Sequence, residues 1–461
     1  MDRKVPLEDI PLNSFHKKLT VYSSGGPFLD GYVLSVIGVV MLQITNELQL
    51  TALWQGLIAA SALIGVFLGG FLGGWITDKL GRKVLYLLDL IAIIGFSVAQ
   101  LWVESAIMLF VLRLILGIAV GADYPIATSF LTEFLPRKYR GVLISVMIVI
   151  WFMGAAAAYI VGEIALHFFG NEAWRWVLAS AAVPGVLFLI ARSGTPESPR
   201  WLVSKGRIAE ADAVVKKVFG PQYSAADLQE GSSSSGPKAT VWSLFHSGYG
   251  KRMLFVCLFW TCSIIPIFAI YAFAPTVLAA MNVPADQASL GAVLITVLFI
   301  VGCAIPAFII NRVGRKRLLL HSFFWSGLML LFLGLNPNAS SQIVMLLFAG
   351  YAIAVGGSQV LQYLYPNELF PTEIRATAVG LGTSVSRIGA AVGTYLVPIA
   401  LSDLGIANTM IIAAGICWIG GVATWVLAPN IDALTLSQAA SLGNDDSPAP
   451  KTAVTSRLKM D

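Results

Sequence analysis

The chain has 461 residues, of which 57% are hydrophobic and only 12% charged, and its mean hydropathy is +0.78. This composition excludes a soluble globular protein, because the apolar residues lie in runs of about 20, the length needed to cross a bilayer core. The net charge of +5 is modest, so the positions of the charges are more informative than their sum.

Twelve apolar runs follow one another along the chain. Only helices and closed barrels satisfy their backbone hydrogen bonds in lipid, and runs this long predict helices. The first run is long and lacks a small-residue cleavage site, so no cleavable signal peptide is expected. The expected spans are 20–44, 54–77, 84–103, 106–132, 141–168, 174–193, 252–281, 288–311, 316–335, 341–366, 373–402 and 407–429.

A polar central segment divides the spans into two sets of six. It contains an amphipathic helical stretch at Ala209–Phe219 and a GSSSSG tract at 231–236, whose composition predicts flexibility. Neither this segment nor the polar C-terminal end suggests a catalytic domain. The expected organisation is an N-terminal six-helix bundle (1–193), a cytoplasmic central loop (194–251), a C-terminal six-helix bundle (252–430) and a disordered cytoplasmic tail (431–461).

The placement of lysine and arginine predicts the orientation. Every even-numbered loop between spans is basic, whereas the odd-numbered loops carry almost no basic residue apart from Arg175. By the positive-inside rule both termini are expected to be cytoplasmic. The protein is therefore expected to be a multi-pass protein of the cytoplasmic (inner) membrane, in contact with the lipid bilayer.

Charged landmarks recur in the two halves. The stretch GWITDKLGRK at Gly74–Lys83 returns as INRVGRK at Ile310–Lys316, and the ends of Glu133–Arg140 match those of Glu368–Arg375. Such repeated spacing favours two bundles related by a parallel repeat. In transporters of this architecture the substrate site lies between the halves, near the middle of the bilayer.

These motifs, together with RLILG…GADYP at Arg113–Pro125 and PESPRWL at Pro196–Leu202, resemble the major facilitator superfamily. Within it they resemble the sugar-porter and metabolite–proton symporter branch, over about residues 20–430. The resemblance implies an all-α membrane protein with twelve transmembrane helices in two six-helix bundles and a pseudo-two-fold repeat. It also implies a transporter that works by alternating access, with a small-molecule substrate and protons as partners, as a functional monomer.

Other functional classes find little support in the sequence. The four cysteines lie inside apolar runs without ligand spacing and the four histidines are scattered, so no metal site is expected. Without a candidate nucleophile or phosphate-binding loop, neither an enzyme, a cofactor nor a nucleic-acid partner is expected. A transporter-like sensor is disfavoured, because no sizeable signalling domain is present.

Carboxylates and basic side chains at the cytoplasmic helix ends predict a gate. Arginine forks suit paired contacts with carboxylates, and such pairs must break when the cytoplasmic side opens. The alternative is that these charges only anchor helix ends at the lipid headgroups. The expected gate residues are Asp78, Arg82, Glu133, Arg140, Glu197, Arg200, Arg315, Glu368 and Arg375.

Charges inside the spans point to proton coupling, because each is unfavourable in lipid and usually lines a cavity. By resemblance, Asp30 in the first span would bind the proton and Arg113 in the fourth would tune its affinity. Sugar porters have Gly-Tyr-Asp where this chain has GYV at 31–33, so a structural ion pair is the alternative for Asp30. Asp123 is expected to be either a second protonation site or a structural acid.

The substrate is predicted largely from what the seventh span lacks. It has neither the amide groups with which hexose carriers bind sugar hydroxyls nor the aspartate of phosphate symporters. Arg387 could receive a carboxylate, which favours an organic or aromatic acid. The alternative is a sugar or another neutral or cationic metabolite, moved by a uniporter, exchanger or exporter. The expected substrate-binding residues are Arg387, Gln359, Gln362, Tyr271, Trp151 and Tyr363.

Overall fold

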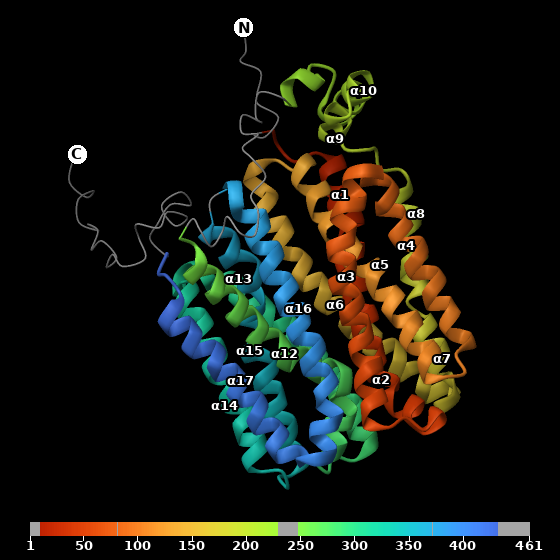
Figure 1. The fold of residues 1–461 in the computed structure, drawn as a ribbon, viewed down its shortest axis with the longest axis vertical. Coiled ribbons are helices and arrows are strands. Elements are labelled where there is room, and N and C mark those ends of the chain that lie inside the picture. Colours follow the sequence, from red (N-terminus) through yellow and green to blue (C-terminus); the bar gives the residue numbers. More distant parts are fainter. Residues whose placement is uncertain (1–9, 81, 229–247, 371, 432–461) are drawn as a thin grey trace, which may run out of the picture.

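The structure, a computed structural model, describes residues 10–80, 82–228, 248–370 and 372–431. Every regular element in these ranges is helical, and twelve helical segments are long and apolar enough to cross a membrane (Figure 1). The expected all-α protein with twelve spans is therefore confirmed. The GSSSSG tract and the tail from residue 432 onward lie outside the described residues.

The N-terminal half supplies six spans. Its first span is α2, which follows the short helix α1 almost without a break, and its sixth is divided into α7 and α8. The helices of this half are α1 (Ser14–Ser23), α2 (Gly25–Leu48), α3 (Ala52–Leu80), α4 (Arg82–Ala99), α5 (Ala106–Phe134), α6 (Arg137–Phe169), α7 (Trp174–Ala179) and α8 (Ala182–Ser193).

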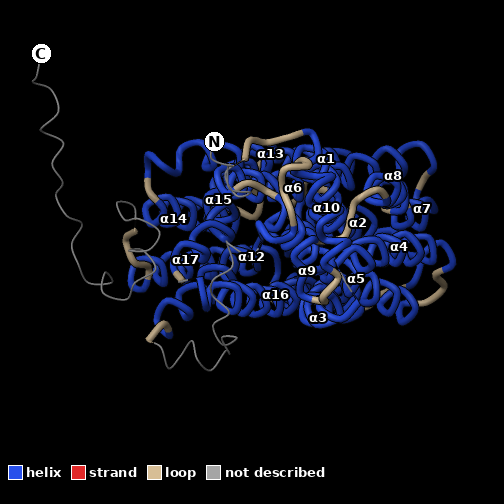
Figure 2. Tube along the Cα trace, turned by 90° about the horizontal axis from the view of Figure 1, so that it is seen from above, coloured by secondary structure: helices blue, strands red, loops and turns tan. Residues whose placement is uncertain are grey.

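The C-terminal half also supplies six spans, and the two halves lie side by side (Figures 1 and 2). Helix α12 contains Pro266 and Pro275 and is kinked at Phe273, because proline removes a backbone donor and obstructs the preceding turn. The helices are α12 (Gly250–Ala280), α13 (Ala285–Val313), α14 (Arg315–Leu335), α15 (Ser341–Leu369), α16 (Thr372–Asp403) and α17 (Gly405–Leu427).

A helical connector joins the halves at one end of the molecule, which we call the connector face (Figure 1). Within PESPRWL, the Ser198 hydroxyl accepts a hydrogen bond from the Trp201 N–H at 3.1 Å and so caps the first connector helix. The second is the amphipathic helix expected from the sequence. Its Val218 packs with Leu19 of α1 and Phe134 of α5. The connector elements are α9 (Pro199–Ser204), α10 (Ile208–Phe219) and η3 (Ala225–Leu228).

The two halves touch closely in the part of the bundle away from the connector face. The Tyr159 hydroxyl of α6 donates to the Tyr271 carbonyl of α12 at 2.6 Å, and Gly38 of α2 packs on the same carbonyl. At the start of α3, Gly56 packs on the Tyr395 carbonyl of α16. Small residues allow helices in a membrane to approach this closely. The interface is therefore closed at the end opposite the connector face.

Gly38→Val is expected to force this end of the interface apart. A Cβ at Gly38 would lie 1.9 Å from the Tyr271 oxygen, so the closed arrangement cannot accept a side chain there. Maleimide labelling of a Tyr395→Cys probe in purified protein should accelerate severalfold in the Gly38→Val background. Gly95→Val is the matched control, because a Cβ at Gly95 meets no atom within 4 Å. Equal labelling rates in both backgrounds would contradict this interpretation.

Candidate functional site

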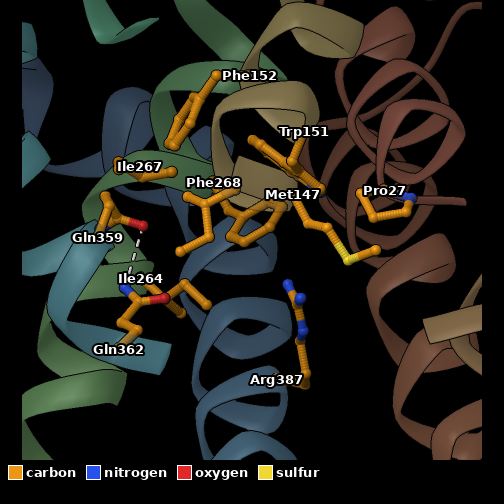
Figure 3. A pocket seen from close by; sticks show the side chains of 11 residues that line it. Pro27, Met147, Trp151, Phe152, Ile264, Ile267, Phe268, Gln359, Gln362 and Arg387 are labelled. Carbon is orange, nitrogen blue, oxygen red and sulfur yellow. Dashed lines mark hydrogen bonds between the residues drawn. The ribbon is translucent and has the colours of Figure 1, made fainter. Parts of the chain in front are cut away.

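A central cavity of about 40 Å³ lies between the two halves (Figure 3). Its walls come from α2 and α6 of the N-terminal half and from α12, α15 and α16 of the C-terminal half. The lining residues are Pro27, Met147, Ile148, Trp151, Phe152, Ile264, Ile267, Phe268, Gln359, Gln362 and Arg387.

The cavity is contracted in this structure. A volume of 40 Å³ holds about three water molecules, which is too little for a metabolite of sugar size. Aromatic side chains pack by edge contacts at its wall, where the Trp151 ring centroid lies 5.7 Å from that of Phe268 and 5.6 Å from that of Tyr271, which stands behind Trp151. A larger ligand must therefore displace side chains or separate the halves on the connector side.

One wall of the cavity is a polar group of uncharged side chains from α12 and α15. Gln359 and Gln362 both donate through Nε2 to the Ser263 hydroxyl, at 2.7 and 2.9 Å. Gln362 also donates to Gln359 Oε1 at 3.0 Å, and the Ser263 hydroxyl donates to Ser358 at 2.8 Å. These bonds hold both amides in fixed orientations at the cavity wall (Figure 3).

Arg387 brings a positive charge into the cavity from α16. Its side chain reaches toward Met147 and Phe268 (Figure 3), and its guanidinium carbon lies 5.4 Å from the Phe268 ring centroid. The residue is 8% exposed, and its Nε and Nη1 groups find no acceptor among the described residues. A buried guanidinium with free N–H groups is able to receive an anionic ligand through paired hydrogen bonds.

Asp30 lies beside this charge. The residue is 5% exposed, and its carboxyl group lies near the Trp151 side chain and within electrostatic range of Arg387. Contacts between α2 and α6 produce this arrangement, because Gly31 packs on the Trp151 carbonyl oxygen, where a Cβ would approach to 2.0 Å. The glycine next to Asp30 therefore allows α6 to bring Trp151 against it.

Arg113 does not have the partner expected from the sequence. It is 1% exposed, and its Nη2 donates to the backbone carbonyl of Val33 at 3.2 Å. The basic side chain that interacts with the Asp30 carboxylate is Arg387, from the other half of the protein. Arg113 is therefore placed to stabilise the α2 backbone one turn beyond Asp30.

Asp123 is also occupied by a partner that we did not predict. Arg192 of α8 donates to both of its carboxylate oxygens, at 2.6 and 3.2 Å. Asp89 of α4 lies against the same guanidinium, at 3.7 Å. A search for ionisable residues inside the apolar runs would have found Asp89, whereas Arg192 lies at the end of its run. None of the three lines the central cavity.

Four of the expected gate residues take part in three contacts that the structure shows clearly. Arg315 pairs with Glu368 through two hydrogen bonds of 3.0 Å, and the Arg375 Nε donates to the Phe370 carbonyl at 3.1 Å. Glu197 accepts from the Lys83 backbone N–H at the start of α4, at 3.2 Å. The first two contacts stay within the C-terminal half, and the third joins the N-terminal half to the central segment. The side chains of Asp78, Arg82, Glu133 and Arg140 lie outside the described part of the chain.

The expected substrate residues divide into three groups. Trp151, Gln359, Gln362 and Arg387 line the cavity, whereas Tyr271 packs behind Trp151. The side chain of Tyr363 lies outside the described part of the chain. The sequence reading missed the apolar lining, including Met147 and Phe152, because nothing local distinguishes a cavity wall from ordinary helix packing.

Comparisons with known proteins agree with this architecture. The family model described as "Sugar (and other) transporter" matches residues 18–442. The putative metabolite transport protein YaaU of Escherichia coli K12 is 43% identical, over 94% of this chain and 97% of that protein. The inner membrane metabolite transport protein YgcS of the same organism is 37% identical, over 95% and 97%. The inward open structure of the E. coli xylose transporter XylE covers 92% of this chain and 99% of its own, with a TM-score of 0.78 and 20% identity.

Proposed function

Because the chain belongs to the sugar (and other) transporter family of the major facilitator superfamily, we propose that it carries a small organic acid across the membrane together with a proton. Membership of this family accounts for the transport of a small molecule across the membrane. The nature of the substrate and its coupling to protons rest on the residues around the central cavity.

The observation that carries the proposal is the state of Arg387. It faces the cavity from α16, it is 8% exposed, and two of its N–H groups lack an acceptor among the described residues. A buried charge without a complete set of partners is unfavourable, and an incoming carboxylate would supply the missing acceptors. Gln359 and Gln362 could then bind hydroxyl groups of the same molecule.

Coupling follows from the position of Asp30. When ionised, Asp30 interacts with Arg387 and competes with the substrate carboxylate for its charge. A proton on Asp30 removes that competition, so the proton and the anion bind together. This linkage of two ligands through one arginine is reciprocal and favours symport.

The proposal also includes the orientation of the protein in the membrane and its transport cycle. The connector face carries the basic loops and would be cytoplasmic, while the exceptional Arg175 is paired with Glu47 at 2.7 Å on the other side. With the contacts of Gly38 and Gly56 closed, this structure would correspond to a state closed toward the outside. The bundles of 1–193 and 252–430 would rock about the cavity, and one chain would suffice for transport.

A neutral sugar is the second candidate. The family name and the fixed pair of amides at Gln359 and Gln362 favour it, since amides bind sugar hydroxyls well. In that case Arg387 would interact with Asp30 alone, and substrate affinity would not depend on a carboxylate group of the substrate.

A thermal-shift screen of organic acids, sugars and amines on the purified protein separates the two candidates. A ligand present at about 100 times its Kd stabilises the folded state by about 2.7 kcal/mol, which is measurable as a higher unfolding temperature. Organic acids, and above all hydroxylated ones, are expected to stabilise the protein, with uptake of the same compounds in proteoliposomes. Stabilisation by neutral sugars and not by acids would support the second candidate instead.

A further inference from the structure

A buried acidic pair lies in the N-terminal half, outside the central cavity. Asp89 of α4 is 6% exposed and Asp123 of α5 is 2% exposed, and Arg192 of α8 is fully buried beside them. We propose that Asp89 and Asp123 together hold one proton against Arg192, as a protonation site distinct from Asp30 and from the substrate cavity.

The hydrogen bonds of Arg192 favour Asp123 over Asp89. Both Nη groups bind the Asp123 carboxylate, whereas the nearest approach to Asp89 is 3.7 Å. The guanidinium also donates to the backbone carbonyls of Tyr22 and Tyr86, at 3.1 and 3.2 Å. Arg192 therefore neutralises one carboxylate fully, and the second has no comparable cation among the described residues.

The charges of this site balance only if a proton is present. Two ionised carboxylates and one guanidinium would leave a net negative charge at a site whose residues are at most 6% exposed, and an unpaired buried carboxylate is strongly unfavourable. Arg192 Nη1 brings the two carboxylates together, since it lies 2.6 Å from Asp123 Oδ1 and 3.7 Å from Asp89 Oδ2, and two carboxylates held this close are stable only when one of them is protonated. Asp89 Oδ2 receives no hydrogen bond from an N–H or O–H donor of the described residues, while its Oδ1 accepts from the Leu90 N–H at 2.7 Å. The proton therefore belongs between Asp89 Oδ2 and Asp123.

The described groups around the pair add no second positive charge. Among the described residues, the titratable and charged groups that face the pair are Arg192, Tyr86 and Asp30. Arg192 lies 3.9 Å above the Tyr86 ring centroid, and the Tyr86 hydroxyl bonds with the Ser23 hydroxyl at 2.7 Å. Asp30 contributes a further negative charge when it is ionised, which strengthens retention of the proton.

The pair also touches the wall of the central cavity. Gly26 packs directly on Asp123, where a Cβ would lie 1.5 Å from Oδ2, and the following residue, Pro27, lines the cavity. Loss of the proton would place a net negative charge beneath the start of α2.

Infrared spectroscopy of the purified protein tests the proposal. The spectrum of wild-type protein minus that of Asp89→Asn, at neutral pH, should contain the C=O stretching band of a protonated carboxylic acid that shifts in D₂O. In wild-type protein alone this band should disappear at alkaline pH. Asp403→Asn, at an exposed carboxylate on α16, is the matched control and should leave no such band in the difference spectrum. A difference spectrum for Asp89→Asn without the band would overturn the proposal.

Thermal unfolding as a function of pH gives a second readout. If the folded protein keeps a proton that the unfolded chain has lost, stability falls as pH rises through that range. Asp89→Asn should remove this component and flatten the slope, because its amide can donate to Asp123 as the protonated acid does. Equal slopes for the two proteins would contradict the proposal. Neither measurement needs a substrate, so its result is independent of the proposed transport function.

Discussion

Arg387→Ala is expected to weaken binding of an acidic substrate by at least about 30-fold, equivalent to about 2 kcal/mol. The reason is that Arg387 brings a positive charge to the cavity wall, and its Nε and Nη1 groups, which find no acceptor among the described residues, can receive the carboxylate. Isothermal titration or tryptophan fluorescence of purified protein would measure the change. Arg387→Ala removes the charge that Asp30 faces, but a proton on the Asp30 carboxyl group compensates for that loss, so the variant should remain folded.

Two further variants identify the cause of that loss. Arg387→Lys keeps the charge but not the planar fork, so its affinity should lie between those of the wild type and the alanine variant. Arg312→Ala makes the same change at an exposed position near the end of α13 and should leave affinity unchanged. If Arg387→Ala bound the substrate as tightly as wild-type protein, the substrate would have no carboxylate at this site.

Asp30→Asn is expected to abolish uptake driven by a pH gradient while leaving exchange of substrate measurable. An asparagine cannot carry a proton, yet it resembles the protonated aspartate in shape and charge, so Arg387 stays available to the substrate. Wild-type affinity should fall by up to about tenfold per pH unit once Asp30 ionises, because one proton is linked to binding. In Asp30→Asn the affinity should show no such dependence. Proteoliposome uptake and binding measured at several pH values would provide both results.

Asp403→Asn serves again as the control, because it removes an exposed carboxylate without touching the cavity. Its uptake and its pH dependence should match those of the wild type. Accumulation by Asp30→Asn at the wild-type level would show that the coupling proton binds elsewhere, and the Asp89–Asp123 pair would be the next position to test.

Much of the fold was predictable because its determinants are local. A run of about 20 apolar residues must form a helix in a bilayer, whatever the rest of the chain does. The twelve spans expected from these runs correspond to the twelve spanning segments of the structure. The amphipathic stretch at Ala209–Phe219 became α10 for the same reason, since its pattern repeats with the helical period.

The partners of the buried charges depended on tertiary structure. Sequence reasoning found Asp30, Asp123 and Arg387 because an ionisable residue in an apolar run is conspicuous by itself. The sequence did not predict which charged side chains interact with each other. Asp123 and Arg192 are 69 residues apart, and Asp30 and Arg387 come from different halves of the protein. The position of Arg113 against the Val33 carbonyl could not be anticipated either.

The sequence by itself therefore determined the class of protein, the number of spans and the ionisable residues that the membrane interior must accommodate. The lengths of the apolar runs and the positions of the charges suffice for these properties, because each depends on the free energy of transferring side chains between water and lipid. Only the tertiary structure decided that Arg387 faces a cavity, that Asp30 lies near it, and that Arg192 binds Asp123 with Asp89 close by. Those facts depend on how helices pack, and close glycine contacts such as that of Gly31 with Trp151 set the packing.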